Sequence, residues 1–379
     1  MGSATKRVEV SPVPRVGDFL AAVEVPVFRR KLMQWYRGNA RKLPWRGVKD
    51  PYRTWVSEIM LQQTRVAAVI EHYHRFLQQF PTIVALSLAP EAEVLGAWSG
   101  LGYYRRARML HKTAQFITRE RGGTLPSDSI GLRTLPGIGD YTAAAIASIA
   151  FGESIAVVDG NVERVLLRVL GKAEVATPAA RALVQAQADG LVPRRRVEGA
   201  SNSAGDHNQA MMELGATVCL PKGPRCGECP VYALCATRGE HVTPAKAAQR
   251  SLPAAYLLNL RKHGTVTEVL LYRRRADERL MPGMLELPPL PEEVVEGREP
   301  LLRLRHSITN TNYYVQVFAP RSLRDKALAR TLAGKEVELE WVRTNRLGGL
   351  PLTGVARKAL QRLDVMAVQP VLWPEKEMV

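Results

Sequence analysis

All four cysteines of this 379-residue chain lie in one short segment, at Cys219, Cys226, Cys229 and Cys235. The spacing, C-x₆-C-x₂-C-x₅-C, allows four thiols to enclose one metal centre. A structural zinc site usually contains two short cysteine pairs, whereas only Cys226 and Cys229 form such a pair here. The spacing therefore favours a [4Fe–4S] cluster, with zinc as the open alternative.

A disulfide framework is disfavoured, because the cysteines form one tight group and residues 1–10 lack the apolar region of a secretory signal. The sequence also contains no apolar run long enough to span a bilayer. We expect a monomer without a membrane partner, located in the cytoplasm if the chain is bacterial.

The charge of the chain favours a polyanionic partner. Lysine and arginine number 53 against 36 acidic residues, which gives a net charge of +17. Tyr103 and Tyr104 are followed directly by Arg105 and Arg106, and aromatic rings beside cations suit nucleic acid. A basic surface without a specific partner is the alternative that charge alone leaves open.

Composition divides the chain into a helical part at 19–236, a linker at 237–253 and an α+β part at 254–366. Gly and Pro separate the apolar periods of the first part, and Gly199–Gly205 is expected to be a loop. The predicted helical segments are 58–80, 90–98, 104–119, 141–151, 162–170 and 178–188. The second part has strand patterns at 255–260, 265–272, 313–318 and 337–342, a turn at 262–264 and a helix at 354–363.

A glycine-rich turn, Leu135-Pro136-Gly137-Ile138-Gly139, precedes the helix expected to begin near Tyr141. Gly137 and Gly139 allow a tight turn that brings backbone N–H groups close to an anion, and the helix N-terminus favours negative charge there. This pattern is typical of a helix-hairpin-helix, which holds a DNA phosphate without reading sequence. An ordinary helix–helix turn is the alternative, and the basic charge favours DNA.

Two carboxylates have contrasting sequence environments. Asp159 stands at the expected start of a helix, where backbone N–H groups favour its ionised form; on local evidence alone, plain N-capping is the favoured interpretation. Glu58 lies among Trp, Ile, Met and Leu, which favour a protonated acid, although a Glu in the first turn of a helix is common. An acid paired with a fixed anion is the arrangement that cleaves glycosidic bonds.

These segments, taken in order, resemble the adenine DNA glycosylase (MutY) family of the helix-hairpin-helix superfamily. The resemblance covers nearly all of residues 19–236, and the second domain resembles the family's Nudix-like domain more loosely. The resemblance implies an all-α helix-hairpin-helix glycosylase with an iron–sulfur cluster loop, followed by an α+β Nudix-like mispair-recognition domain. The motifs that carry it are LPWR (43–46), WVSEIMLQQTRV (55–66), GLGYYRRAR (100–108), LPGIGDYTAAAIAS (135–148), VDGNVERVL (158–166), NQAMMELGA (208–216) and the cysteine array.

The resemblance also implies an activity, which is excision of adenine mispaired with 8-oxoguanine or guanine in double-stranded DNA. Glu58 would protonate the leaving adenine, and Asp159 would stabilise the cationic sugar with support from Asn161 and Tyr141. Gln63 and Tyr103 fall at positions that wedge into the duplex. The positions that line the family's adenine pocket are Arg41, Trp45, Arg46, Leu61, Gln209 and Met212; ordinary core and surface roles are their alternatives.

Three departures from related patterns matter. Related bifunctional glycosylases carry a lysine that forms a Schiff base where this chain has Tyr141, so we expect a mainly monofunctional enzyme. The family's Phe-Ser-His loop aligns with Ile308-Thr309-Asn310, where Thr309 keeps a hydroxyl for 8-oxoguanine. The Nudix hydrolase box is absent from the sequence, which predicts no pyrophosphatase activity.

Three other functions remain to be tested. A bifunctional glycosylase for damaged pyrimidines is opposed by Tyr141 and by the second domain. A DNA-binding iron–sulfur protein without catalysis is opposed by the joint presence of Glu58 and Asp159. The third is a protein that binds zinc, rather than an iron–sulfur cluster, through the four cysteines.

Overall fold

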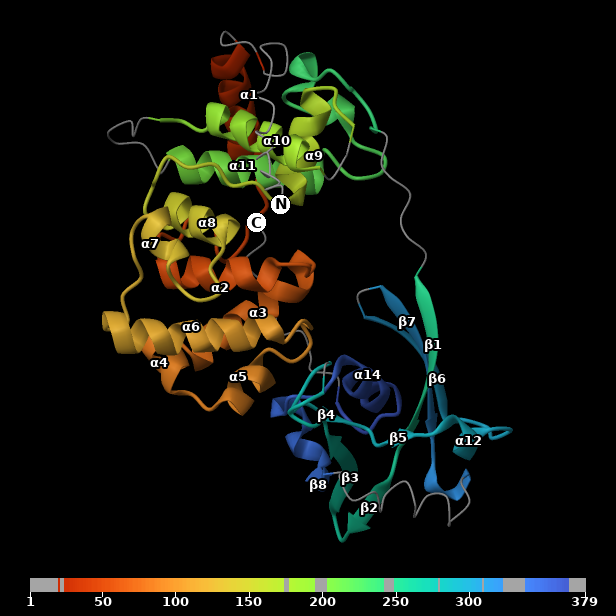
Figure 1. Ribbon diagram of the computed structural model, residues 1–379. Helices are drawn as coiled ribbons and strands as arrows, with labels where there is room; N and C mark the ends of the chain where they lie inside the picture. Colours follow the sequence, from red (N-terminus) through yellow and green to blue (C-terminus); the bar gives the residue numbers. More distant parts are fainter. Residues whose placement is uncertain are drawn as a thin grey trace, which may run out of the picture. The chain divides into compact units, whose positions relative to one another are not determined.

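The computed structural model describes residue 20 and residues 24–173, 177–194, 203–241, 249–278, 280–308, 310–322 and 338–367 (Figure 1). The chain forms two compact units, each built from two stretches of sequence. The first unit combines Met1–Ile59 with Thr124–Ala245. The second combines Met60–Gly123 with Lys246–Val379. None of the helices in the described ranges combines the length and apolar character needed to cross a membrane.

The first unit is helical and has one main core. Its helices are α1 (Glu24–Asn39), α2 (Pro51–Leu61, whose last two residues belong to the second unit), α7 (Ser129–Arg133), α8 (Asp140–Ala150), α9 (Gly160–Val169), α10 (Pro178–Leu191) and α11 (Ser203–Thr217). Helix α9 buries Val162, Val165, Leu166 and Val169, the spacing of one helix face. These side chains pack with Phe28 of α1 and with residues of α10 and α11.

A close approach of α9 and α11 depends on Gly215. A Cβ atom at this position would lie 2.6 Å from the Asn161 Cβ and 2.8 Å from the Asn161 carbonyl oxygen. Because the second neighbour is backbone, a small rotation of a side chain cannot relieve the clash. Glycine at position 215 therefore lets the N-terminal end of α9, which carries Asp159 and Asn161, lie directly against α11.

The second unit begins with helices and ends with strands. Its helices are α3 (Val66–Gln79), α4 (Ile83–Leu88), α5 (Glu91–Ala97), α6 (Arg105–Arg121), α12 (Glu292–Val295) and α14 (Gly354–Arg362). The expected continuous helical stretch at 58–80 is wrong, because α2 ends at Leu61 and α3 begins at Val66. The break contains Gln63, whose φ of 55° is left-handed and incompatible with a right-handed helix.

The strands form two sheets in the described ranges. They are β1 (Arg250–Leu257), β2 (Leu260–His263), β3 (Val266–Arg273), β4 (Leu285–Glu286), β5 (Pro289–Leu290), β6 (Leu302–Ile308), β7 (Thr311–Phe318) and β8 (Glu338–Arg343). One sheet has the order β5-β1-β7-β6, and the other has β2-β3-β4 with β8 paired to β3. Strands β1 and β7 run parallel, with Ala255 opposite Gln316. Leu271, Leu285, Val317 and Leu360 lie in the core that joins strands of both sheets to α14.

Most of the predicted helices and strands are confirmed within a few residues, but three boundaries are wrong. Strand β1 begins at Arg250, inside the segment assigned to the linker. Lys262 and His263 belong to β2, and the turn follows at Gly264 with a φ of 59°. The expected loop at 199–205 is helical from Ser203; its residues 199–202 lie outside the described ranges. Most of the first residues of α11 are small or short polar ones with low helix propensity, so the start of the helix resembles a loop in the sequence.

We predict that Gly215→Ala lowers the free energy of unfolding by about 1–3 kcal/mol, the usual cost of overpacking a filled interior. Urea unfolding of the wild type and the variant measures this change. Gly190→Ala is the matched control, because Gly190 also lies in a helix but has no atom within 4 Å of its added Cβ. The control should be neutral or slightly stabilising. Equal stability changes in the two variants would contradict the packing argument.

Candidate active site

Glu58 lies on α2 with a side chain sealed from solvent. The residue is 5% exposed, and its helix neighbours Trp55, Val56 and Met60 are buried. The pKa of Glu58 is raised to about 7, mainly by burial; a hydrogen bond from Tyr141 opposes the rise, and the nearby charge of Asp159 adds to it. Glu58 is the eighth residue of α2, so the alternative of a first-turn Glu is wrong. A carboxyl of this kind can carry a proton near neutral pH.

Tyr141, the second residue of α8, connects Glu58 to the packed interior. Its hydroxyl donates a hydrogen bond of 2.6 Å to Glu58 Oε2 and lies 3.8 Å from Met212 Sδ. Burial raises the pKa of Tyr141 well above its ordinary value, as do the neighbouring carboxylates Glu58 and Asp159. The phenol therefore stays protonated and fixes one oxygen of the Glu58 carboxyl. The sequence-predicted Glu58, Tyr141, Asp159 and Met212 are thus brought into one site.

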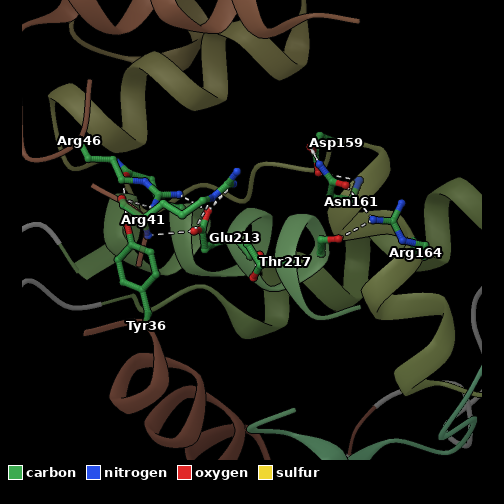
Figure 2. Close-up of polar contacts among 10 residues, drawn as sticks. Tyr36, Arg41, Arg46, Asp159, Asn161, Arg164, Glu213 and Thr217 are labelled. Atoms are coloured by element: carbon green, nitrogen blue, oxygen red, sulfur yellow. Dashed lines mark hydrogen bonds and ion pairs between the residues drawn. The ribbon is translucent and has the colours of Figure 1, made fainter. Parts of the chain in front are cut away.

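Asp159 is held at the N-terminus of α9 by three hydrogen bonds (Figure 2). Its Oδ1 accepts from the backbone N–H groups of Asn161 at 2.9 Å and Val162 at 2.7 Å. Its Oδ2 accepts from Asn161 Nδ2 at 2.8 Å. All these donors stabilise the anion. Asp159 therefore caps α9 and is at the same time a fixed negative charge, so the two interpretations of the sequence describe the same contacts.

Asn161 is fixed in turn by Arg164, one turn along α9 (Figure 2). The Arg164 guanidinium donates to Asn161 Oδ1 at 2.7 Å and to the Gly215 carbonyl at 2.7 Å. It also donates to the Cys219 carbonyl at 2.8 Å. A chain of hydrogen bonds therefore connects Asp159 with the start of the cysteine segment. Arg164 was not predicted from the sequence, because its spacing from Asn161 on one helix face is the only local signal of this contact.

A second buried carboxylate, Glu213 on α11, holds the two arginines predicted for the adenine pocket (Figure 2). Arg41 donates from Nε and Nη2 at 2.8 and 2.7 Å, and Arg46 donates from Nη2 at 2.5 Å. The Glu213 side chain has no exposed surface. Burial opposes its charge, yet these hydrogen bonds lower the pKa of Glu213 to about 2. The sequence analysis missed Glu213, although it stands inside the NQAMMELGA motif.

The other predicted pocket residues divide between the two units. In the first unit, Trp45 is buried, and Gln209 Oε1 accepts a hydrogen bond of 3.1 Å from the Tyr36 hydroxyl. In the second unit, Leu61 is half-buried at the end of α2, whereas Gln63 and Tyr103 are exposed. Tyr103 is 44% exposed, which is unusual for a large aromatic side chain. Thr309 lies outside the described residues.

The predicted hairpin lies between α7 and α8. Leu135 and Ile138 are buried and anchor it, whereas Gly137 and Gly139 are exposed. Gly137 has a φ of 74°, the left-handed backbone that glycine accommodates, and Gly139 directly precedes α8. The hairpin thus presents flexible residues at a helix N-terminus, the geometry that accepts an anion.

The four cysteines are half-buried in a segment with two short 3-10 turns, Cys226–Glu228 and Tyr232–Leu234. The pKa of Cys229 is raised to about 11, mainly by burial; the Val231 N–H lowers it, and the other three thiols add to the rise. No group of three or more His, Cys, Asp or Glu in the described ranges is placed to hold a metal ion.

Hydrogen-bond donors surround these sulfur atoms. Arg168 donates to Cys219 Sγ at 3.4 Å, and the Arg238 N–H donates to Cys235 Sγ at 3.4 Å. Arg168 also donates to the carbonyls of Leu220 and Pro221 at 2.7 and 3.1 Å, which fixes the loop backbone. Donors aimed at sulfur stabilise thiolates, so the chemistry of the donor set fits an iron–sulfur cluster.

Comparisons with known proteins identify the family of the chain. Residues 56–186 match the model of the HhH-GPD superfamily base excision DNA repair protein. The adenine DNA glycosylase of Mycobacterium tuberculosis strain H37Rv is 39% identical over 244 residues, which cover 63% of this chain and 77% of that protein. The chain belongs to the adenine DNA glycosylase family. This family typically binds an iron–sulfur cluster.

The match to longer relatives is partial. The human adenine DNA glycosylase is 47% identical over 229 residues, which are 58% of this chain and 41% of the human protein. The chain thus spans less than half the length of that relative. The solved structure of a thermostable thymine-DNA glycosylase aligns with a TM-score of 0.52 at 28% identity, covering 57% of this chain and 97% of that one. This alignment supports the helical glycosylase fold.

We predict that Glu213→Gln lowers the free energy of unfolding by about 3 kcal/mol near neutral pH, since each tenfold change in proton affinity is worth about 1.4 kcal/mol. The folded-state pKa of Glu213 is depressed from 4.5 to about 2. Its contribution is therefore present above about pH 4.5 and is lost as the pH falls toward about 2. Urea unfolding over this pH range measures the difference between wild type and variant.

The matched control is Glu120→Gln, which removes a carboxylate from an exposed ion pair with Arg119. Such pairs contribute only about 0–1 kcal/mol. A stability difference for Glu213→Gln that does not shrink as the pH falls would contradict the assigned charge.

Proposed function

We propose that this chain is a base-excision repair enzyme that flips adenine out of a mispair with 8-oxoguanine or guanine and hydrolyses its N-glycosidic bond. The observation that carries the proposal is the pairing of a protonatable Glu58 with a fixed anion at Asp159 in a member of this family. Family membership narrows the leaving base to adenine, and the positive charge of the chain suits duplex DNA.

Glu58 acts as the general acid. A pKa of about 7 leaves a substantial protonated fraction at neutral pH, and Tyr141 occupies Oε2 so that Oε1 can carry the proton toward the base. The proton passes to N7 of the adenine as the bond between the sugar C1′ and the base nitrogen breaks. The bonding electron pair leaves with the adenine, and positive charge develops on the sugar.

Asp159 stabilises that positive charge. Its carboxylate is held by Asn161 and Val162 in a fixed orientation, so it needs little reorganisation when the sugar becomes cationic. Water then adds to C1′ and releases a proton to the Glu58 carboxylate, which restores the acid. Tyr141 replaces the lysine of bifunctional relatives, so this chain forms no Schiff base and works mainly as a monofunctional glycosylase.

The remaining predicted residues act in binding. The hairpin at Gly137 and Gly139 holds a DNA phosphate, and Gln63 and Tyr103 enter the duplex beside the extruded base. Arg41 and Arg46, held by Glu213, present guanidinium groups to the adenine pocket. Trp45, Leu61, Gln209 and Met212 supply the rest of its lining.

The cysteines at 219, 226, 229 and 235 hold a [4Fe–4S] cluster that fixes the shape of their loop. The clustered thiols and the donors from Arg168 and Arg238 support this assignment. The cluster supplies structural order rather than a step of base release.

The second half of the chain supplies recognition of the opposite base. We assign residues 254–366 to a Nudix-like domain without pyrophosphatase activity, joined to a catalytic domain at 19–236 by a linker that begins at residue 237 and ends before β1 at Arg250. Ile308 is the last residue of β6 and lies opposite Thr311, the first residue of β7, so the segment proposed to recognise the opposite base connects these two strands. The enzyme acts as a monomer.

A single-turnover assay with a duplex that contains adenine opposite 8-oxoguanine tests the activity. We expect Glu58→Gln to slow base release by about 10²–10⁴-fold and Asp159→Asn by about 10²–10³-fold, while DNA binding is retained. Asp189→Asn, on the exposed face of α10, is the control and should match the wild type. A wild-type protein that binds the duplex tightly but leaves no abasic site would sink the proposal in favour of a non-catalytic binder.

The pH dependence of the wild-type reaction gives an independent test. Because the general acid must be protonated, the single-turnover rate should fall as the pH rises through about 7, the pKa of Glu58. A rate that stays level well above this pH would contradict the role of Glu58.

Borohydride trapping tests the absence of a Schiff base. We expect little crosslinking of the protein to DNA, and efficient crosslinking that does not depend on Tyr141 would contradict the monofunctional assignment.

Metal analysis tests the cluster. The purified protein should contain about four iron atoms per chain and show the broad visible absorbance of an iron–sulfur cluster. Cys229→Ser should lose both signals and some thermal stability. One tightly bound zinc per chain, with no iron, would favour the zinc alternative.

A further inference from the structure

The Arg106 side chain lies at the junction of two loops in the second unit. The residue belongs to α6, which begins one residue earlier at Arg105. Its Nη1 donates to the Met60 carbonyl at 3.0 Å and to the Gln62 carbonyl. Its Nη2 donates to Thr64 Oγ1 at 3.0 Å and to the Gly102 carbonyl at 3.2 Å. One guanidinium thus joins the loop after α2 to the loop before α6.

The same group also contacts two aromatic rings. The Arg106 Cζ lies 5.5 Å from the ring centroids of both Trp98 and Tyr103. Trp98 is fully buried, whereas Tyr103 is exposed. The guanidinium therefore connects an exposed ring to a buried one, and a planar cation is the group best suited to do so.

The loops on either side of Arg106 contain left-handed residues that are not glycine. Gln63 has a φ of 55° and Tyr103 has a φ of 49°. Such a backbone costs about 1–2 kcal/mol per residue and persists only where the surroundings enforce it. Both side chains are exposed, so burial of these side chains does not offset the cost.

Arg106 binds the peptide group that precedes each of these residues. The Gln62 carbonyl belongs to the peptide that ends at the Gln63 nitrogen, and the Gly102 carbonyl belongs to the peptide that ends at the Tyr103 nitrogen. The orientation of that peptide, relative to the following Cα, is what φ describes. The two hydrogen bonds therefore act directly on the strained angles of Gln63 and Tyr103.

We infer that Arg106 is a positioning residue that holds Gln63 and Tyr103 in strained conformations as a matched pair of wedges for opening the DNA duplex. This inference rests on the proposed function, in which the two side chains enter the duplex. Free wedge side chains would lose conformational entropy on insertion, and a prearranged pair avoids part of that loss. Arg106 itself need not touch the DNA.

Lysine cannot replace Arg106 in this role. Its ammonium group has three donors around one point, whereas the guanidinium presents five donors in a plane to acceptors on two loops. The strained loops would then relax, and Gln63 and Tyr103 would sample other orientations. The chemical step would be unaffected once adenine has left the helix.

The test compares two duplexes that carry the same adenine:8-oxoguanine mispair. One has paired flanks, and the other has mismatched flanks that make extrusion easy. We expect Arg106→Lys and Arg106→Gln to slow single-turnover base release by about tenfold or more on the paired duplex, since unstacking a base costs a few kcal/mol. On the mismatched duplex, both variants should approach the wild-type rate.

Three further variants make the result specific. Thr64→Val removes one acceptor of Arg106 and should show the same pattern with a smaller loss. Arg119→Gln removes the same charge from an exposed position on α6 and should match the wild type on both duplexes. Asp159→Asn should lose activity equally on both, because its defect is chemical. Near-ultraviolet circular dichroism sets an assay temperature at which every variant is folded.

A second readout does not depend on base release. Fluorescence of 2-aminopurine placed beside the mispair reports unstacking, and its rise on protein binding should be reduced in Arg106→Lys. Equal slowing of Arg106→Lys on both duplexes, or no slowing on either, would overturn the inference. Absence of base release by the wild type would refute the proposed function, while the fluorescence comparison would still test Arg106.

Discussion

The first unit is organised by the cost of placing two negative charges in one buried site. The Asp159 carboxylate is held at the start of α9 by three N–H donors, which complement its negative charge. Glu58, surrounded by apolar side chains, then faces an existing anion and retains its proton near neutral pH. The contrast between the two carboxyl groups follows from the position of a helix end, rather than from any difference between Asp and Glu.

Much of the positive charge of the chain serves internal hydrogen bonding. Arg106 and Arg164 each bind several oxygens that belong to separate segments, and Arg168 is almost completely buried beside the cysteine loop. These positions need the planar guanidinium, which reaches several acceptors at once. The net charge of +17 therefore overstates the positive charge that is available to bind a polyanionic partner. A count of charged residues in the sequence does not distinguish arginines that form internal hydrogen bonds from those that contribute to a positive surface.

Local patterns predicted most elements of the fold, because apolar periodicity and Gly or Pro punctuation are local properties. The helices around Asp159 and Tyr141 were placed within two residues, and N-capping by Asp159 followed from its position alone. The break between α2 and α3 was missed, since the left-handed Gln63 is held by Arg106 from a distant part of the chain. Strand β6 was also missed, because only Leu302, Leu304 and Ile308 of its seven residues are apolar, although Arg303 and Arg305 occupy the exposed positions of a regular alternation.

Local sequence patterns could not predict which site residues contact each other. Glu58 and Tyr141 are 83 positions apart, and Arg41 meets Glu213 across 172 positions. For Glu58 and Tyr141, the resemblance to a family named the residues, but only the fold shows that a phenol fixes the carboxyl. Glu213 was overlooked because an acidic residue on a helix is usually a solvated side chain.

The cysteine segment bears on the site through backbone order. Arg164 binds the Cys219 carbonyl with the same guanidinium that orients Asn161, and Arg168 fixes the next two carbonyls and the Cys219 sulfur. If the segment loosened, Arg164 would lose a fixed acceptor, and Asn161 would lose the donor that sets its amide orientation. Asp159 would keep its two backbone N–H bonds but lose the side-chain donor that directs its second oxygen. Order in a loop outside the site is therefore a condition for a well-oriented Asp159 carboxylate.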